Sequence, residues 1–348
     1  MNLETTIWLV LDSRANGGIE THVLELARGL RQSRWQVSVV LIKDHGPHPL
    51  RSALQREGIP TFCLDGGAAS LVRRLRSERP ALIHSHGYKA GLYCCAAARV
   101  TGCAHVSTFH AGDFGSGRVA LYDWLHRQSS RFNEANFAVS SEIADRVPRR
   151  PLVLNNFVSL PGPSAASGDR LAFVGRFSEE KGPDRLITIA AGLPATRFDF
   201  YGDGPLLARL KTEAGDNCRF HGNQADMTPH WRDIGLLLMP SRHEGLPMAA
   251  LEAMARRIPV IAFDVGGLGR VIDSGENGWL VESGDVDGFR RAIEGWLALC
   301  ESRRDLIRDA ARRSIVERFS SQKIVPMVLE QYRQAVNKAV PACDAFCE

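Results

Sequence analysis

Short apolar runs alternate with helical patterns along almost the whole chain, and this alternation constrains the fold most. Ile19, Val23, Leu26 and Leu30 recur at helical spacing directly after the first run. Strands that alternate with helices join into parallel sheets through right-handed crossovers, and helices then cover both faces. The sequence therefore predicts an α/β fold of doubly wound parallel sheets. The expected strands are 7–11, 36–42, 61–64, 81–84, 105–109, 135–140, 171–174, 197–201, 219–220, 234–239, 259–263 and 278–281.

A segment near the middle of the chain is rich in small and helix-breaking residues. Residues 159–168 hold two prolines, two glycines and three serines, which is typical of a linker. With 348 residues the chain is also too long for one ordinary core. We therefore expect an N-terminal domain at 1–158, a linker at 159–169, a second domain at 170–321, and a final helix with its tail at 322–348.

Composition places the chain among globular proteins. It is 44% hydrophobic and 24% charged, and no apolar run approaches the roughly 18 residues of a membrane span. The first apolar run meets Asp12 and Arg14 without a small-residue cleavage site, which indicates a strand rather than a signal peptide. Eight scattered cysteines without a Cys-x-x-Cys pair are typical of reduced thiols. The expected location is the cytoplasm.

Positive charge is concentrated in the first half of the chain. Residues 1–160 hold 19 Lys and Arg against 13 Asp and Glu, whereas the remainder is slightly acidic. Arg73, Arg74, Arg76 and Arg79 form one basic run. A solvated helix face explains this run most simply; the alternative is a peripheral surface that contacts anionic lipid at the inner face of a membrane, or an anionic acceptor. A nucleic-acid partner is not expected.

The segment at 241–252, Ser-Arg-His-Glu-Gly-Leu-Pro-Met-Ala-Ala-Leu-Glu, joins a buried strand to a helix. Pro247 is typical of a first helical turn, and free backbone N–H groups at a helix N-terminus bind anions, phosphate above all. Glu244 and Glu252 bracket this turn and suit sugar or ribose hydroxyls. The plain alternative makes both glutamates ordinary helix-start and solvent-facing residues.

Two further groups of polar residues follow predicted strands. Arg176 and Lys181 lie in one loop between Gly175 and Gly182, where a guanidinium and an ammonium can converge on a pyrophosphate; alone, the pair would read as two exposed cations. In the first domain, the strand ends hold Gly17, Gly18, His84, His86 and His110. Ligands of such sheets bind at the carboxyl ends of the strands, so one crevice is expected there.

Together these segments resemble a retaining nucleotide-sugar glycosyltransferase of family 4, with the GT-B arrangement of two Rossmann-like domains facing a central cleft. The resemblance covers about residues 5–337, and it implies a last helix that crosses back to the first domain. The matching segments are 17–20 (Gly-Gly-Ile-Glu), 108–110 (Thr-Phe-His), 139–140 (Val-Ser), 153–156 (Val-Leu-Asn-Asn), 174–182 (Val-Gly-Arg-Phe-Ser-Glu-Glu-Lys-Gly), 202–205 (Gly-Asp-Gly-Pro), 241–252, 266–267 (Gly-Gly) and 276–281 (Glu-Asn-Gly-Trp-Leu-Val).

The resemblance implies a role for each matching residue. The implied catalytic residues are His110, Arg176, Lys181 and Glu244, with the two cations offsetting charge on the departing nucleoside diphosphate without a metal. The implied donor-binding residues are Gly17, Gly18, Gly175, Arg176, Lys181, Gly204, Glu244, Gly245, Leu246, Pro247, Met248 and Glu252. Glu20, His86 and Asp113 are assigned to the acceptor side. The partners are a nucleotide-sugar donor and a saccharide or lipid-linked acceptor, with no cofactor and no metal.

Some residues depart from the family pattern or fit it loosely. Arg270 stands where the family commonly has glutamate, so we do not assign it a contact with the donor. The Asp-x-Asp at 285–287 precedes a helix and is expected to cap it rather than bind metal. His84 and His86 are either acceptor-side groups or packed strand-end histidines. His22 is expected on the exposed side of its helix.

Three functions remain open at this point. The first is a glycosyltransferase for cell-surface polysaccharide, lipopolysaccharide or glycolipid assembly. The second is a sugar-nucleotide epimerase of similar architecture, which would need no acceptor. The third is a non-catalytic nucleotide-sugar-binding protein. A dinucleotide oxidoreductase is not favoured, because the full Gly-x-Gly-x-x-Gly spacing is missing.

Overall fold

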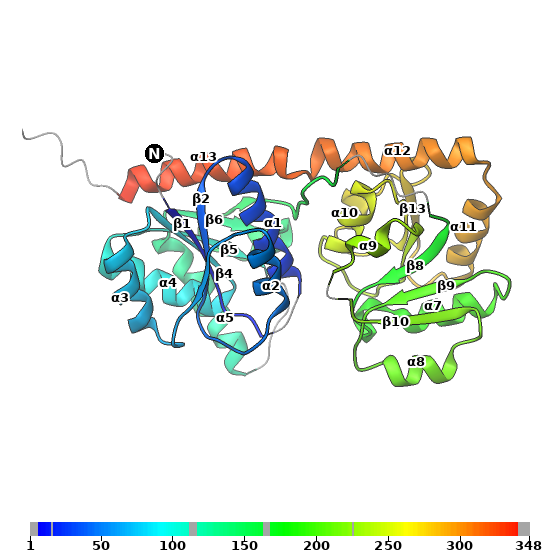
Figure 1. Cartoon of the computed structure of the whole chain (residues 1–348), viewed down its shortest axis with the longest axis horizontal. Helices are drawn as coiled ribbons and strands as arrows, with labels where there is room; N and C mark the ends of the chain where they lie inside the picture. Colours follow the sequence, from blue (N-terminus) through cyan, green and yellow to red (C-terminus); the bar gives the residue numbers. More distant parts are fainter. Residues whose placement is uncertain (1–5, 15–16, 111–116, 163–167, 225, 340–348) are drawn as a thin grey trace, which may run out of the picture. The chain divides into compact units, whose positions relative to one another are not determined.

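A computed structural model describes residues 6–14, 17–110, 117–162, 168–224 and 226–339. The chain divides into two compact units (Figure 1). The first comprises residues 1–159 together with 321–348, and the second comprises residues 160–320. Each unit is a parallel sheet with helices, so the predicted α/β class is confirmed. The predicted cleft between the domains stays a prediction.

The first unit is built on a seven-stranded parallel sheet in the order β3-β2-β1-β4-β5-β6-β7. Its first helix, α1, follows β1 directly, as the alternation predicts. The strands are β1 (Thr6–Leu11), β2 (Gln36–Leu41), β3 (Thr61–Cys63), β4 (Leu82–His86), β5 (Ala104–Phe109), β6 (Ala135–Ala138) and β7 (Leu152–Val153). The helices are α1 (Gly18–Gln32), α2 (Pro49–Arg56), α3 (Ala68–Glu78), α4 (Tyr88–Thr101), α5 (Arg118–Ser129), α6 (Ser141–Ala144) and α13 (Ser321–Ala339), with a 3-10 turn, η1, at Ser130–Phe132.

Both faces of this sheet are buried, and alternate residues of β1 serve opposite faces. Ile7 and Leu9 join the cluster that holds Val23 of α1, whereas Trp8 and Val10 join the cluster that holds Cys94 of α4. This alternation follows from the two-residue period of a strand. The sheet is therefore covered by helices on both sides, as in doubly wound folds.

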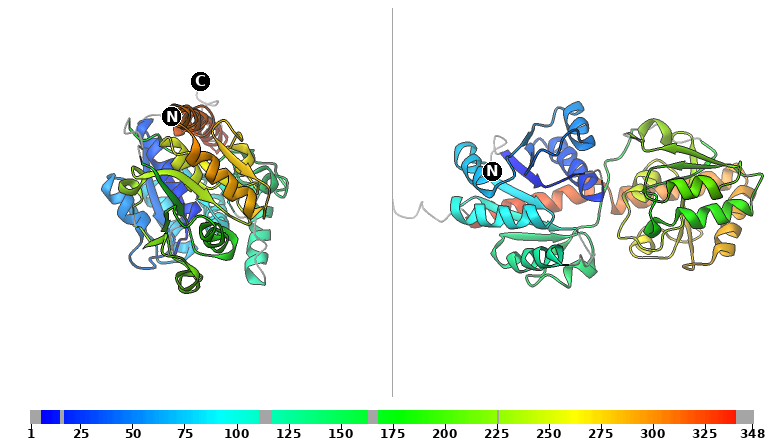
Figure 2. Two further views of the ribbon diagram at one scale, coloured as in Figure 1. Left: turned by 90° about the vertical axis from the view of Figure 1, so that its right-hand side faces the viewer. Right: turned by 90° about the horizontal axis from the view of Figure 1, so that it is seen from below.

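The last helix, α13, belongs to the first unit although it ends the chain. Ile324, Val328 and Tyr332 recur at a spacing of four residues on one face of this helix, and all three are part of that unit's core. The helix packs on α1 and β5 and runs beside the first unit in Figures 1 and 2. A Cβ on Gly29 of α1 would overlap Val325, so the two helices approach closely. The predicted return of the last helix to the first domain is confirmed.

The second unit has a six-stranded parallel sheet in the order β10-β9-β8-β11-β12-β13. A core of phenylalanine and branched aliphatic side chains lies under its helices, with Phe173, Phe200 and Phe263 fully or almost fully buried. The strands are β8 (Arg170–Val174), β9 (Phe198–Tyr201), β10 (Cys218–Gly222), β11 (Ile234–Met239), β12 (Val260–Phe263) and β13 (Gly278–Val281). The helices are α7 (Pro183–Ala191), α8 (Leu207–Glu213), α9 (Thr228–Trp231), α10 (Met248–Ala255), α11 (Val286–Ala298) and α12 (Glu301–Arg318), with 3-10 turns η2 at Glu179–Lys181 and η3 at Leu268–Arg270.

Several finer expectations can be compared with the structure. Asp285 is the N-cap of α11, and its carboxylate accepts from the Gly288 N–H at 2.7 Å, which confirms the capping role. The six described cysteines are free; Cys343 and Cys347 lie outside the described residues. The basic run is exposed on and beside α3, and Arg74 pairs there with Glu78. Among the helices that the structure describes, none is long and apolar enough to cross a membrane.

Candidate active site

Loops at the carboxyl edge of the second sheet pack backbone against backbone. Gly182 has φ +64°, and a Cβ there would overlap the carbonyl oxygen of Pro240. Gly266 has φ +57°, and a Cβ there would overlap the carbonyl oxygen of Glu244. Only glycine allows both this backbone conformation and this close approach. The glycines therefore bring the loops after β8, β11 and β12 to one place.

A buried carboxylate and a lysine form an ion pair at this place. Lys181 Nζ donates to Glu244 Oε2 at 2.7 Å, and the Glu244 side chain is only 2% exposed. Ser241 Oγ donates to the other carboxylate oxygen, also at 2.7 Å. Both oxygens of Glu244 are thus held by partners from its own loop and from the loop after β8. The Lys181 side chain keeps 30% exposure, so its ammonium is open to a ligand.

The other predicted donor-side residues at this sheet edge lie in the loops after β8 and β9. Arg176 is exposed on the loop that carries Lys181. The Gly175 N–H donates to the Tyr201 carbonyl at 3.0 Å, which holds the start of this loop to β9. A Cβ on Gly204 would crowd the backbone of Phe177. The predicted cations therefore lie on one braced loop at the sheet edge.

The helix after the Glu244 turn begins directly after Pro247. Pro247 is the N-cap, in an extended conformation, and α10 starts at Met248. A Cβ on Gly245 would meet open space, whereas Leu246 is buried. Glu252 lies on α10, half-buried. The turn therefore presents its backbone to the surface at Gly245, and the prediction of a first-turn proline was wrong by one position.

An ion pair that the sequence did not reveal braces the same loops. Arg242 donates to both carboxylate oxygens of Asp184, at 2.9 and 2.6 Å, and its backbone N–H donates to the Glu180 carbonyl at 2.7 Å. This bidentate pair ties the Glu244 loop to the start of α7. Neither residue carries a signal in its spacing, because they lie 58 positions apart.

The residues of the predicted crevice lie at the carboxyl edge of the first unit's sheet, and of these His86 and His110 line a cavity. Gly17 is the N-cap of α1 and is exposed, as is Gly18. Glu20 is 8% exposed, and its carboxylate lies close to Gly17. His86 ends β4 and His110 follows β5 directly. Asp113 lies outside the described residues, so its acceptor-side role stays a prediction.

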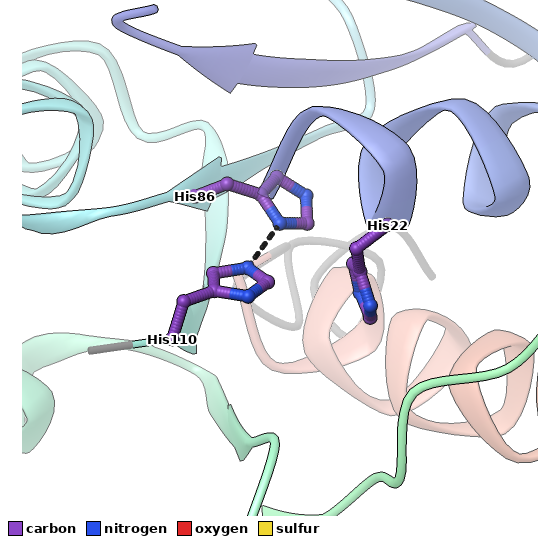
Figure 3. Close-up of side chains that lie close together, drawn as sticks. All are labelled: His22, His86 and His110. Atoms are coloured by element: carbon purple, nitrogen blue, oxygen red, sulfur yellow. Dashed lines mark hydrogen bonds between the residues drawn. The ribbon is translucent and has the colours of Figure 1, made fainter. Parts of the chain in front are cut away.

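His22 is buried, not exposed as expected. It is 2% exposed, and its Nδ1 lies 3.2 Å from Asn156 Oδ1. The helical spacing already contained this result, because His22 lies three residues after Ile19 and four before Leu26, on the buried face. The prediction of an exposed His22 gave more weight to the polarity of the side chain than to its position on the helix. The burial of His22 brings it to His86 and His110, as Figure 3 shows.

Burial keeps the histidines of this edge neutral. It lowers the pKa of His22 to about 4, and it lowers the pKa of His86 and of His110 well below the ordinary value, with neighbouring histidines adding to the effect. Burial disfavours the charged imidazolium because it removes hydration. At neutral pH these rings are therefore uncharged, with one bare nitrogen each.

His84 is a packed strand-end histidine, one of the two alternatives left open. Its Nδ1 lies 2.5 Å from the Tyr332 hydroxyl and its Nε2 lies 2.6 Å from Thr108 Oγ1. Its ring also packs against that of His86, with the centroids 4.2 Å apart and the rings tilted by 38°. Tyr332 of α13 therefore helps to hold the strand end that carries His86.

A cavity of about 150 Å³ opens beside His86 and His110 within the first unit. Its charged walls are self-paired: Lys89 Nζ lies 2.8 Å from Asp12 Oδ2, and Arg127 lies 2.5 Å from Asp123. Burial raises the pKa of Asp12, but hydrogen bonds from Lys89 and His45 outweigh this effect and hold the pKa below its usual value. The charged side chains of the cavity wall are thus paired with one another, and they lie beside uncharged imidazoles. Asp123 and Arg127 lie four positions apart on α5, which is the spacing of a helical ion pair, whereas Asp12 and Lys89 lie 77 positions apart and show no such signal.

Comparison with known proteins identifies the family. A model described as Glycosyltransferase Family 4 matches residues 16–153, and one described as Glycosyl transferases group 1 matches residues 164–313. The chain is a two-unit α/β protein of the glycosyltransferase class, and it belongs to glycosyltransferase family 4 with the GT-B fold.

Individual relatives agree with this assignment. The lipopolysaccharide core biosynthesis glycosyltransferase LpsE of Rhizobium meliloti is 35% identical over 162 residues, which are 45% of this chain and 47% of that protein. A D-inositol 3-phosphate glycosyltransferase of Mycobacterium tuberculosis is 32% identical over 181 residues, 48% of this chain and 38% of that protein. The matches thus span less than half the length of these curated relatives.

A solved structure shares the fold of the whole chain. Alr3699/HepE of Anabaena, in complex with UDP-glucose, superposes with a TM-score of 0.80 at 19% identity, covering 95% of this chain and 100% of that one. At this identity the likeness shows the fold alone. The predicted family and fold are confirmed.

Proposed function

We propose that the protein transfers a sugar, with retention of anomeric configuration, from a nucleoside-diphosphate sugar to a hydroxyl acceptor. The observation that carries the proposal is the Lys181–Glu244 pair at the sheet edge of the second unit. A lysine ammonium with residual exposure can bind a diphosphate, and when Lys181 turns from Glu244 to the phosphates, the released carboxylate oxygen can accept a hydrogen bond from a sugar hydroxyl. The relatives named above are glycosyltransferases, and HepE was solved with UDP-glucose.

The chemistry of the step needs charge neutralisation more than acid–base catalysis. Negative charge develops on the departing nucleoside diphosphate, and Arg176 and Lys181 supply two cations on one loop. His110 is neutral at physiological pH because burial lowers its pKa, so it would act as a hydrogen-bonding partner of the sugar. We propose that no metal takes part in the transfer.

The acceptor side is proposed to take a saccharide or a lipid-linked saccharide. The cavity beside His86 and His110 has self-paired charges, which suits a neutral polyhydroxylated group. One wall comes from α5, which contributes Asp123 and Arg127. The same helix exposes large apolar side chains to the surface. These are Val119 at 44%, Leu121 at 55%, Tyr122 at 45%, Trp124 at 52% and Leu125 at 38%.

We therefore propose peripheral contact of α5 with the cytoplasmic face of a membrane, in cell-surface polysaccharide, lipopolysaccharide or glycolipid assembly. An exposed apolar helix with basic residues nearby can lie in a lipid interface. Sedimentation with vesicles of phosphatidylglycerol and phosphatidylethanolamine checks this. The double variant Leu121→Ser with Trp124→Ser should stay in the supernatant, while Leu306→Ser, which alters an exposed leucine of α12, should sediment like the wild type. Equal sedimentation of all three would contradict the contact.

The test of the activity is a transfer assay with a panel of nucleoside-diphosphate sugars. Proton NMR of the product reports the anomeric configuration, and retention requires the configuration of the donor. An acceptor-free arm separates the alternatives, because an epimerase would convert the donor alone. If the protein binds a donor but transfers no sugar to any acceptor tested, it is instead a nucleotide-sugar-binding protein.

A further inference from the structure

Three histidines from different elements of the first unit converge at one point. His22 lies on α1, His86 ends β4 and His110 follows β5. One ring nitrogen of each lies within 4.8 Å of the others, and His86 Nδ1 is 3.0 Å from His110 Nε2. The ring centroid of His22 lies 4.9 Å from that of His110. Figure 3 shows the three rings turned toward a common space.

The hydrogen bonds within the cluster leave a buried ring nitrogen without a partner. His86 is 2% exposed, and its Nε2 has no hydrogen-bond partner among the described residues. A buried polar atom without a partner is costly, so an unsatisfied nitrogen points to a ligand that is bound there at least part of the time. The His84 ring packs against the same ring at a tilt of 38°, with the centroids 4.2 Å apart.

The hydrogen bonding around the cluster also suits a metal ion. Most metal-binding histidines donate their second ring N–H to an acceptor, which holds the ring in place. His22 has such a partner in Asn156, at 3.2 Å. His86 and His110 also line the cavity of about 150 Å³, which is large enough to hold a water molecule as a fourth ligand.

We propose that His22, His86 and His110 bind a divalent transition-metal ion of the zinc class. Three imidazoles and an open fourth position are a donor set that Zn²⁺ favours, with Zn–N distances of about 2.0–2.1 Å. Tetrahedral ligands at that distance lie roughly 3.3 Å apart. The nitrogens are already within 4.8 Å of one another, so small ring movements close the site.

The ion has a consequence for transfer, and this part rests on the proposed function. His110 is the group proposed to contact the transferred sugar. When the His110 nitrogen that would contact the sugar coordinates the ion instead, it is not available to the sugar, so metal binding and transfer exclude each other. The ion is therefore an inhibitor rather than a cofactor, and Zn²⁺ should lower turnover of the full-length enzyme.

Cobalt titration of the tag-free full chain tests the site without any activity assay. Co²⁺ replaces Zn²⁺ and gives visible d–d absorption when its coordination is tetrahedral. We expect one Co²⁺ per chain for the wild type and at least tenfold weaker binding for His22→Gln and His86→Gln. The matched control, His230→Gln, alters a half-buried histidine of the second unit and should bind like the wild type. Equal binding by all variants, or no stoichiometric binding by the wild type, overturns the proposal.

A second measurement keeps the test independent of how the variants fold. X-ray absorption of the zinc-loaded wild type should show about three imidazole nitrogens at 2.0–2.1 Å; a shell without imidazole scattering overturns the site. Zinc should then inhibit sugar transfer by the wild type. The residual transfer activity of His22→Gln should be insensitive to zinc. An enzyme that binds cobalt but transfers no sugar refutes the proposed function and leaves the metal site standing.

Discussion

Lys181 Nζ lies 2.7 Å from Glu244 Oε2, joining the loop after β8 to the loop after β11. The two residues are 63 positions apart and meet because Gly182 and Gly266 let the loop backbones touch. The pair is preorganised, so a diphosphate that draws the ammonium finds the carboxylate already in place. Because little rearrangement is needed, the pair favours a ligand that carries phosphates at one end and hydroxyl groups at the other.

Ser241→Ala should weaken the position of Glu244 without removing any charge. The Ser241 hydroxyl is buried and donates to Glu244 Oε1 at 2.7 Å. Its loss should cost about 1–2 kcal/mol of unfolding free energy and raise KM for the donor. Denaturant unfolding and donor kinetics measure the two effects. Ser283→Ala, at an exposed position, serves as control, and identical behaviour of the two variants would refute the role of the hydroxyl.

Gly182→Ala should disturb the junction of the two loops. A Cβ there would overlap the Pro240 carbonyl oxygen, and φ is +64°. We expect a loss of more than about 1 kcal/mol of unfolding free energy, together with weaker donor binding. Gly295→Ala is the matched control, because it lies in α11 with open space around it and should stabilise by about 0.5–1 kcal/mol. Equal stability of both variants would contradict the packing.

Tyr332→Phe should reveal how α13 supports the histidine edge. The Tyr332 hydroxyl is 2.5 Å from His84 Nδ1, and both residues are buried. Removing the hydroxyl leaves a buried nitrogen unpaired, which costs about 1–3 kcal/mol. Urea unfolding should show this loss, whereas Tyr122→Phe, which alters a tyrosine that is 45% exposed, should change little. A Tyr332→Phe protein as stable as the wild type would rule out the supporting bond.

Acid should destabilise the first unit through its buried histidines. Burial lowers the pKa of His105 to about 3, and the nearby His126 adds to the shift. In the unfolded chain the pKa of this side chain is near 6.5, so below pH 6.5 the unfolded state binds more protons than the folded state. The contribution of His105 to the free energy of unfolding is therefore complete above pH 6.5 and is lost as the pH falls toward 3. At pH 5.5 the loss from one such residue is about 1.4 kcal/mol.

The measurement is the free energy of unfolding at pH 7.5 and at pH 5.5. His105→Gln should lose about 1.4 kcal/mol less than the wild type on this acidification, while His230→Gln should not differ from the wild type. An unchanged pH dependence in His105→Gln would show that His105 does not carry the acid sensitivity.

The sequence predicted the fold well because parallel strands and their helices leave strong periodic patterns. The twelve expected strands are all present within a few residues, and the glycine motifs marked the loops that converge. Short elements such as α6, β7 and α9, of two to four residues, have too few positions to show a period. The site was predicted less completely, because Arg242–Asp184 and Asp12–Lys89 depend on long-range contacts. His22 was misplaced because its polarity was weighed above its helical spacing.

The central claim is that the Lys181–Glu244 edge binds the diphosphate of the donor, and calorimetric titration tests it most directly. Uridine, guanosine and adenosine diphosphates are titrated into the wild type, Lys181→Ala and the control Lys211→Ala, which removes an exposed lysine of α8. We predict that the preferred diphosphate binds Lys211→Ala as it binds the wild type, and binds Lys181→Ala at least tenfold more weakly. The same affinity for all three proteins would contradict the account.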